Sequence, residues 1–291
     1  MSAKNSNVST LATALILCLV CSVMVSAVAV GLKAQQKANA TLDLNKNILV
    51  AAGKFDPNTD TNAVVDERFQ AFEIRLVNLE TGKFATDEEI KTAGITDIAN
   101  YDVAKAARTP ALSTPLESDI AGIGGKPKFG KAYLSKDASG EIELIVLPFN
   151  GAGLWGQIYG LITLDKDMNT IKGVNFYEHK ETPGLGSRIQ DEPWRAQWVD
   201  KKLYGDVEAT LAVHPADADG NSGKSIGNHS GDLIMAVTKA GSAKDGEVDG
   251  ISGATLTGRG VNNMLQFWLG VNGYKPFLDN LRAGKADGQG A

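Results

Sequence analysis

The stretch Asp249–Gly260, which reads DGISGATLTGRG, concentrates side chains that could hold a ligand. Its hydroxyl groups belong to Ser252, Thr255 and Thr257. The chain then becomes apolar at helical spacing, and a helix start offers unpaired N–H groups and a positive dipole end to a phosphate. Capping is the simpler alternative, because Ser252 or Thr255 could accept hydrogen bonds from those N–H groups. Gly253 and Ala254 favour the phosphate, since small residues leave room for a ligand.

A second cluster surrounds Trp155 in the stretch Asn150–Gly160, NGAGLWGQIYG, between two expected strands. Its glycines allow a ligand to approach the backbone closely. Leu154 and the indole ring of Trp155 offer an apolar surface to a flat ligand. A turn around a packed tryptophan explains the same residues equally well.

A third cluster lies in Tyr177–Ile189, YEHKETPGLGSRI, where a strand ends in polar residues. Gly184, after proline, indicates a turn. Glu181, Thr182 and the neighbouring backbone groups could bind the polar edge of a heterocycle, with Leu185 as an apolar lid. The alternative is a tight polar connection without a ligand.

The composition limits the classes of function. The chain has 291 residues and a net charge of −5, and no basic run favours nucleic-acid binding. Its two cysteines, Cys18 and Cys21, both lie in the N-terminal apolar stretch, so the body has no thiol for a disulfide, a zinc-thiolate site or an iron–sulfur cluster. No metal site is expected, because His214 and His229 have no further ligand at a recognisable spacing.

The segment Ala218–Ser225, ADGNSGKS, matches a relaxed phosphate-binding loop. That mechanism needs a strand before the loop and a helix after it. Both flanks are rich in helix-breaking residues, so we expect a polar insertion over residues 215–232 and no nucleotide hydrolysis.

The N-terminus contains no charged residue from Asn5 to Leu32. Its most apolar part, Leu11–Leu32, would form a helix of roughly 33 Å, enough to cross a bilayer. A signal peptide cleaved after Ala29 is the alternative, but the apolar run is long for one. The few flanking lysines lean toward a cytoplasmic body under the positive-inside rule.

The body alternates between strand and helix patterns. Its expected strands are 74–84, 131–134, 143–149, 157–164, 171–177, 208–213 and 233–238, and its expected helices are 34–52, 63–73, 192–199, 255–269 and 277–282. The fold class is therefore α+β, a mixed β-sheet domain packed by a few helices and preceded by one N-terminal transmembrane helix.

Asp249-Gly-Ile-Ser-Gly-Ala-Thr255 matches the flavin-attachment motif, Asp-x-x-Ser/Thr-Gly-Ala-Thr, of the bacterial FMN-binding domain. With the N-terminal anchor, the GLWG loop and the ETPGLG segment in the same order, nearly the whole chain resembles the C subunits of sodium-translocating NADH:quinone reductases. The resemblance implies an anchor over residues 1–33, a connecting region over 34–100, an FMN-binding domain over 101–283 and a flexible tail over 284–291.

The resemblance also implies the chemistry. FMN would be joined through its phosphate to Thr255, with Trp155 and Leu185 against the ring. No His or Lys lies in the motif to deprotonate Thr255, and the resemblance implies a separate flavin transferase that uses FAD. It further implies neighbouring subunits of a membrane complex and a body on the periplasmic face of the bacterial inner membrane, against the weak charge bias.

Two other functions stay open at this stage. The G subunit of the related ferredoxin:NAD electron-transport complex shares the attachment motif. The second is an anchored ligand-binding or interaction module without a redox role, which predicts a colourless protein. The main interpretation is an electron relay that carries covalent FMN. We expect no NADH site in this chain, because no Gly-x-Gly-x-x-Gly fingerprint occurs in a βαβ context.

Overall fold

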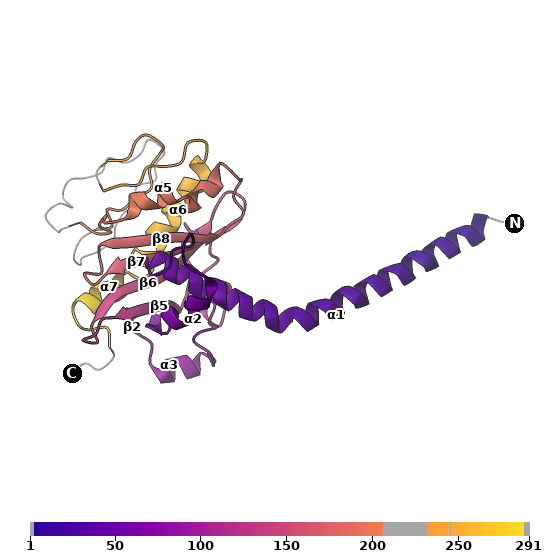
Figure 1. Cartoon of the computed structure of the whole chain (residues 1–291), viewed down its shortest axis with the longest axis horizontal. Coiled ribbons are helices and arrows are strands. Elements are labelled where there is room, and N and C mark those ends of the chain that lie inside the picture. Colours follow the sequence, from indigo (N-terminus) through magenta and orange to yellow (C-terminus); the bar gives the residue numbers. More distant parts are fainter. Residues whose placement is uncertain (1–2, 206–231, 245, 288–291) are drawn as a thin grey trace. The chain divides into compact units, whose positions relative to one another are not determined.

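The computed structural model describes residues 3–205, 232–244 and 246–287. It divides into two units, Met1–Lys46 and Asn47–Ala291. The first unit consists of most of the long helix α1 (Ala3–Ala51), and the last turn of α1 belongs to the second unit (Figure 1). Within the described residues, Val8–Ala51 is the one helix that is long and apolar enough to cross a membrane, which confirms the expected N-terminal helix.

The second unit combines short helices with one large sheet. Its α-helices are α2 (Val65–Phe69), α3 (Asp87–Thr92), α4 (Val103–Ala107), α5 (Glu192–Arg195), α6 (Thr255–Trp268) and α7 (Lys275–Arg282). Single 3-10 turns occupy Asn62–Val64, Gly186–Gln190 and Ala196–Trp198. Its strands are β1 (Phe72–Asn78), β2 (Lys83–Phe84), β3 (Ser113–Thr114), β4 (Lys126–Pro127), β5 (Phe129–Lys136), β6 (Ile142–Ala152), β7 (Gln157–Asp165) and β8 (Ile171–Glu178).

The main sheet has the strand order β2-β1-β5-β6-β7-β8, and β3 pairs separately with β4. The α+β class is confirmed, with one difference. Every strand pair of the sheet is antiparallel in the described residues, where a mixed sheet was expected. For the pairs among β5 to β8, the physical reason is that these strands follow one another through short turns, and such turns can join only antiparallel neighbours.

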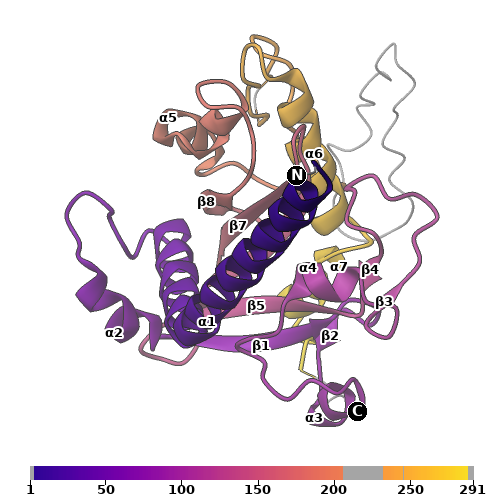
Figure 2. The ribbon, with the colours of Figure 1, turned by 90° about the vertical axis from the view of Figure 1, so that its right-hand side faces the viewer.

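Helices lie over both faces of the main sheet (Figure 2). Successive side chains along each strand point to these two faces in turn. On one face, α2 brings Phe69 to Tyr133, and Asn175 donates to the Oδ1 of Asn47 at 2.9 Å at the end of α1. On the other face, Phe149 and Phe176 pack edge to face with ring centroids 5.7 Å apart. This second face carries α6 and α7.

Helix α6 approaches the end of β6 very closely, because glycines lie at the contact. A Cβ on Gly151 would stand 2.6 Å from the Cβ of Met264, and a Cβ on Gly260 would stand 2.4 Å from the carbonyl oxygen of Ala152. The indole N–H of Trp268 donates to the carbonyl of Asn150 at 2.7 Å. The start of α6 is thereby held beside the turn that joins β6 to β7.

Three expected elements differ from the structure. The strand expected over 74–84 forms two strands, β1 and β2, because the chain turns at residues 79–82. The helix expected over 63–73 ends at Phe69, because β1 begins at Phe72 and the chain reverses between them. The strand expected over 233–238 forms only isolated bridges, Leu233 with Tyr204 and Val237 with Val248. These residues do not pair with either edge strand of the main sheet. The expected strand 208–213, both loop histidines and most of the 215–232 insertion lie outside the described residues.

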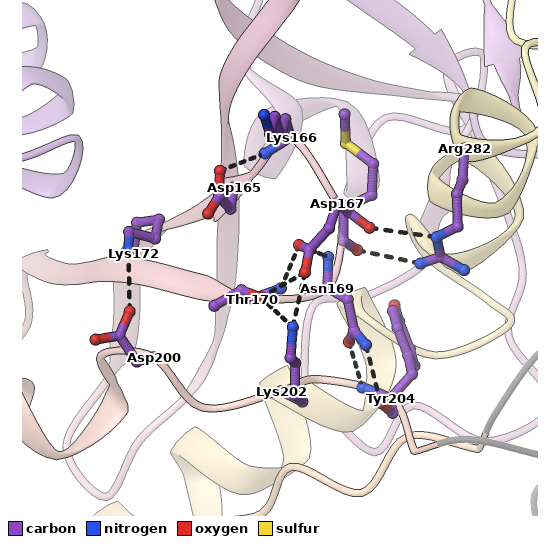
Figure 3. A network of polar contacts seen from close by, with 11 residues as sticks. Asp165, Lys166, Asp167, Asn169, Thr170, Lys172, Asp200, Lys202, Tyr204 and Arg282 are labelled. Atoms are coloured by element: carbon purple, nitrogen blue, oxygen red, sulfur yellow. Dashed lines mark hydrogen bonds and ion pairs between the residues drawn. The ribbon is translucent and has the colours of Figure 1, made fainter.

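A polar network fixes the turn between β7 and β8, at the end of these strands opposite to the β6–β7 turn (Figure 3). Lys202 contacts the carboxylate of Asp167 at 2.7 Å and also the hydroxyl of Thr170. The Arg282 guanidinium donates to the carbonyl oxygens of Asp167 and Met168 at 3.3 Å. Burial alone would raise the pKa of the Asp167 carboxyl, but the hydrogen bonds from Lys202 and Thr170 hold that pKa well below its usual range.

The α6 contact predicts a difference between two glycines of one helix. Gly260→Ala should lower the free energy of unfolding by ~1–3 kcal/mol, because its methyl group would collide with the Ala152 carbonyl. Gly258→Ala is the matched control. Its methyl group would meet Val237 at an ordinary 3.9 Å, and alanine favours a helix by up to ~1 kcal/mol. Thermal unfolding of both variants in detergent measures the difference, and equal stabilities would contradict the contact.

The Asp167 network predicts a dependence of stability on pH. The pKa of this carboxyl is lower in the folded state, so its contribution is present at neutral pH and is lost as the pH falls below about 4. Asp167→Asn should therefore flatten the fall in melting temperature between pH 7 and pH 3. Asp200→Asn, which removes only an exposed ion pair with Lys172, should keep the wild-type slope. A slope unchanged in Asp167→Asn would rule the network out as an acid-sensitive element.

Candidate functional site

The turn between β6 and β7 exposes two apolar side chains. Gly153 and Gly156 close it through an N–H to carbonyl hydrogen bond of 2.7 Å. Leu154 is 47% exposed and Trp155 is 64% exposed at its tip. The indole N–H of Trp155 donates to the hydroxyl of Thr182 at 3.0 Å. The ring is thus both accessible and oriented.

The segment after β8 supplies the partner of that ring. The carbonyl of Thr182 accepts the N–H groups of Leu185 at 3.1 Å and of Ser187 at 3.2 Å, so the segment folds into a compact turn. Gly184 has φ +74, a left-handed conformation that suits glycine. Leu185 is 45% exposed and points toward the third segment, where its Cδ2 lies 3.3 Å from the position of a Cβ on Gly253.

The third segment is the start of α6, which begins at Thr255. Gly253 has φ +80, and Ala254 is the residue before the helix. No side chain caps this helix, so the capping interpretation is wrong for the described structure. The first backbone N–H with an acceptor in the helix is that of Gly258, which donates to Ala254.

The hydroxyl groups of this segment lie in different environments. Ser252 and Thr255 are exposed and have no hydrogen-bond partner among the described residues. The hydroxyl of Thr257 is buried and donates to the carboxylate of Glu181. Arg259 lies exposed one turn further along the same helix. The Thr255 hydroxyl is therefore accessible at a helix start whose N–H groups are free to bind an anion.

The carboxylate of Glu181 joins the three segments. It accepts the backbone N–H of Trp155 at 3.1 Å with one oxygen and the Thr257 hydroxyl with the other. The sequence placed Glu181 on the ligand's rim, but the side chain is only 4% exposed. All the predicted site residues thus lie on three segments that touch one another, and Glu181 lies beneath them.

Asp249 has a structural role that the sequence analysis missed. Its carboxylate accepts the backbone N–H groups of Gly241 at 2.7 Å and Ser242 at 3.1 Å, which lower its pKa. Its carbonyl accepts the indole N–H of Trp194 at 2.8 Å. Asp249 therefore fixes the loop in front of the motif. The acidic residue at the first motif position was the signal that could have indicated this.

The loop that contains Ala121 and Gly122 also borders the β6–β7 turn, and the sequence did not predict this contact. The carbonyl of Ala121 accepts the Ala152 N–H at 2.7 Å, and the carbonyl of Gly122 accepts the Gln157 side-chain amide at 2.8 Å. No sequence signal indicates this contact, which joins residues about thirty positions apart. In the part of the chain that the structure describes, no group of three or more His, Cys, Asp or Glu is arranged to hold a metal ion.

Comparison with known proteins gives consistent matches. Residues 153–270 match the family model of the FMN-binding domain. The chain is 38% identical to the C subunit of the Na(+)-translocating NADH-quinone reductase of Pseudomonas aeruginosa, over 98% of this chain and 100% of that one. It is also 38% identical to the corresponding protein of Pasteurella multocida, over 97% and 96% of the two chains.

Solved structures agree with the sequence matches. The crystal structure of Shewanella oneidensis NqrC superposes with a TM-score of 0.66 at 32% identity, covering 84% of this chain and 99% of that one. The crystal structure of the corresponding protein from Parabacteroides distasonis gives a TM-score of 0.58 at 26% identity, covering 85% and 96% of the two chains.

This chain belongs to the family of C subunits of Na(+)-translocating NADH-quinone reductases. The resemblance found in the sequence is thereby confirmed. The FMN-binding domain match begins at Gly153 and ends at Gly270, so it includes all three site segments and the whole of α6.

Proposed function

We propose that the chain carries FMN covalently on Thr255, through a phosphoester bond, and relays electrons within a membrane sodium-pumping NADH:quinone oxidoreductase. The supporting observation is the exposed, unpartnered hydroxyl of Thr255 at an uncapped helix start. Bound FMN would supply the capacity to accept and pass on electrons. The other subunits of the complex, which the names of the relatives imply, would be its partners.

The residues around Thr255 fit the proposed group. No described residue accepts the N–H groups of Thr255, Leu256 and Thr257, so they can donate to phosphate oxygens. Gly253 keeps a Cβ out of the approach, while Trp155 and Leu185 provide exposed apolar surface for a flat ring. Ser252, Ala254, Leu154, Thr182 and Gly184 complete the surroundings.

Attachment would need a partner enzyme. In the proposed reaction, the Thr255 oxygen bonds to the FMN phosphorus of FAD, AMP leaves, and the hydroxyl proton is taken up by a base. No His or Lys lies in the motif, so we assign that base to a flavin transferase.

The attachment site can be tested with near-isosteric variants. Thr255→Val should fold and insert normally but carry no covalent flavin when it is produced with a flavin transferase. Thr257→Val should keep covalent flavin, because that hydroxyl is buried against Glu181. Fluorescence of the denatured polypeptide and mass spectrometry measure attachment. Flavin that remains on the Thr255→Val chain would sink the assignment.

We also propose that α1 is an uncleaved anchor and that the body faces the periplasm of a bacterial inner membrane. A fusion after Asp60 to a reporter that is active only outside the cytoplasm should be active, and a fusion to a reporter that works only inside should be silent. The opposite pattern would place the body in the cytoplasm. A mature chain that begins at Val30 would show instead that the segment is a cleaved signal peptide.

A further inference from the structure

Glu181 is a carboxylate in an unusual place. Charged side chains are rarely fully buried unless they are paired, yet Glu181 is 4% exposed. Its partners are two neutral donors, the backbone N–H of Trp155 and the hydroxyl of Thr257, which is 1% exposed. The first donor lies in the β6–β7 turn and the second on α6.

Two glycines make room for this carboxylate. A Cβ on Gly153 would stand 2.5 Å from the Oε1 of Glu181, and a Cβ on Gly186 would stand 2.8 Å from its Oε2. Neither glycine has a positive φ, so turn geometry does not require them. The sequence pattern suggested that the glycines around Trp155 let a ligand approach the backbone, but the space beside Gly153 is filled by Glu181. The space beside Gly186 is filled by Glu181 and the Thr257 hydroxyl.

We infer that Glu181 is a positioning residue for the site. It holds the main chain of the β6–β7 turn against the start of α6, while the next residue, Thr182, orients the Trp155 ring. The ring is therefore fixed relative to Thr255 before any ligand arrives. The relevance of this to flavin rests on the proposed function, but the contact can be tested without flavin.

The chain offers a built-in probe of the turn. Trp155 is 64% exposed, whereas Trp194, Trp198 and Trp268 are at most 6% exposed. Quenching of tryptophan emission by iodide therefore reports mainly on Trp155. Hydrogen exchange at the Trp155 amide reports directly on its bond to Glu181.

Both readouts should be measured on the full chain, in detergent, produced without a flavin transferase. Glu181→Leu keeps the size but removes both acceptors. It should speed exchange of the Trp155 amide by about fivefold and increase quenching. Glu181→Gln keeps one amide oxygen for the Trp155 N–H and an amide N–H₂ for the Thr257 oxygen, so it should remain close to wild type.

A matched control separates this role from the effect of removing any buried polar group. Thr163 is fully buried and its hydroxyl has no hydrogen-bond partner among the described residues, so Thr163→Val should not change either readout. If Glu181→Leu does not fold, Thr257→Val removes one partner of the same carboxylate and should speed exchange at Trp155 in the same direction.

Different outcomes would overturn the inference about Glu181 and the proposed function. Unchanged exchange at Trp155 in a folded Glu181→Leu or Thr257→Val chain overturns the inference, and so does a Glu181→Gln chain as loose as Glu181→Leu. When the chains are produced with a flavin transferase, Glu181→Leu should keep its covalent flavin but show lower flavin fluorescence anisotropy. A wild-type chain without flavin would sink the proposed function, while the exchange result would still support Glu181 as a positioning residue.

Discussion

The close approach of α6 to the end of β6 is the contact on which the site depends. Gly151 and Gly260 allow it, because a side chain at either position would overlap its neighbour. The contact carries the first turn of α6 to the β6–β7 turn, so that Thr255, Thr257 and Trp155 share one region. Packing of α6 on the sheet thus brings the site segments together, and the polar contacts orient individual side chains within them.

Local patterns predicted much of this fold. The strands β5 to β8 have β-branched and apolar runs, and α6 has helical spacing, so both were found from the sequence alone. Helix α3 was missed although Thr86 and Glu89 form a capping box, which is a recognisable signature. The strand expected over 233–238 failed for a different reason: its pattern suits a strand, but pairing depends on which edge is available.

The sequence predicted the three segments of the site but not the contacts that join them. Each of the three segments was recognisable from residue types, since aromatic, glycine-rich and hydroxyl-rich stretches are distinctive. The burial of Glu181 was not predictable, because it depends on how separate segments pack in space. The acidic first position of the motif could have indicated a structural role for Asp249, but not its partners Gly241 and Ser242. The capping alternative was also a local argument, and it failed because neither Ser252 nor Thr255 accepts a hydrogen bond at the helix start.

The buried carboxylate has an electrostatic consequence for any electron carrier bound above it. Glu181 has no ion-pair partner among the described residues, and its oxygens are occupied only by neutral donors. In its ionised form it would place a negative charge in a low-dielectric layer, where salt screens poorly. Such a charge opposes the arrival of a further electron. The carboxylate would therefore make the carrier a stronger reductant, by an amount that changes little with ionic strength.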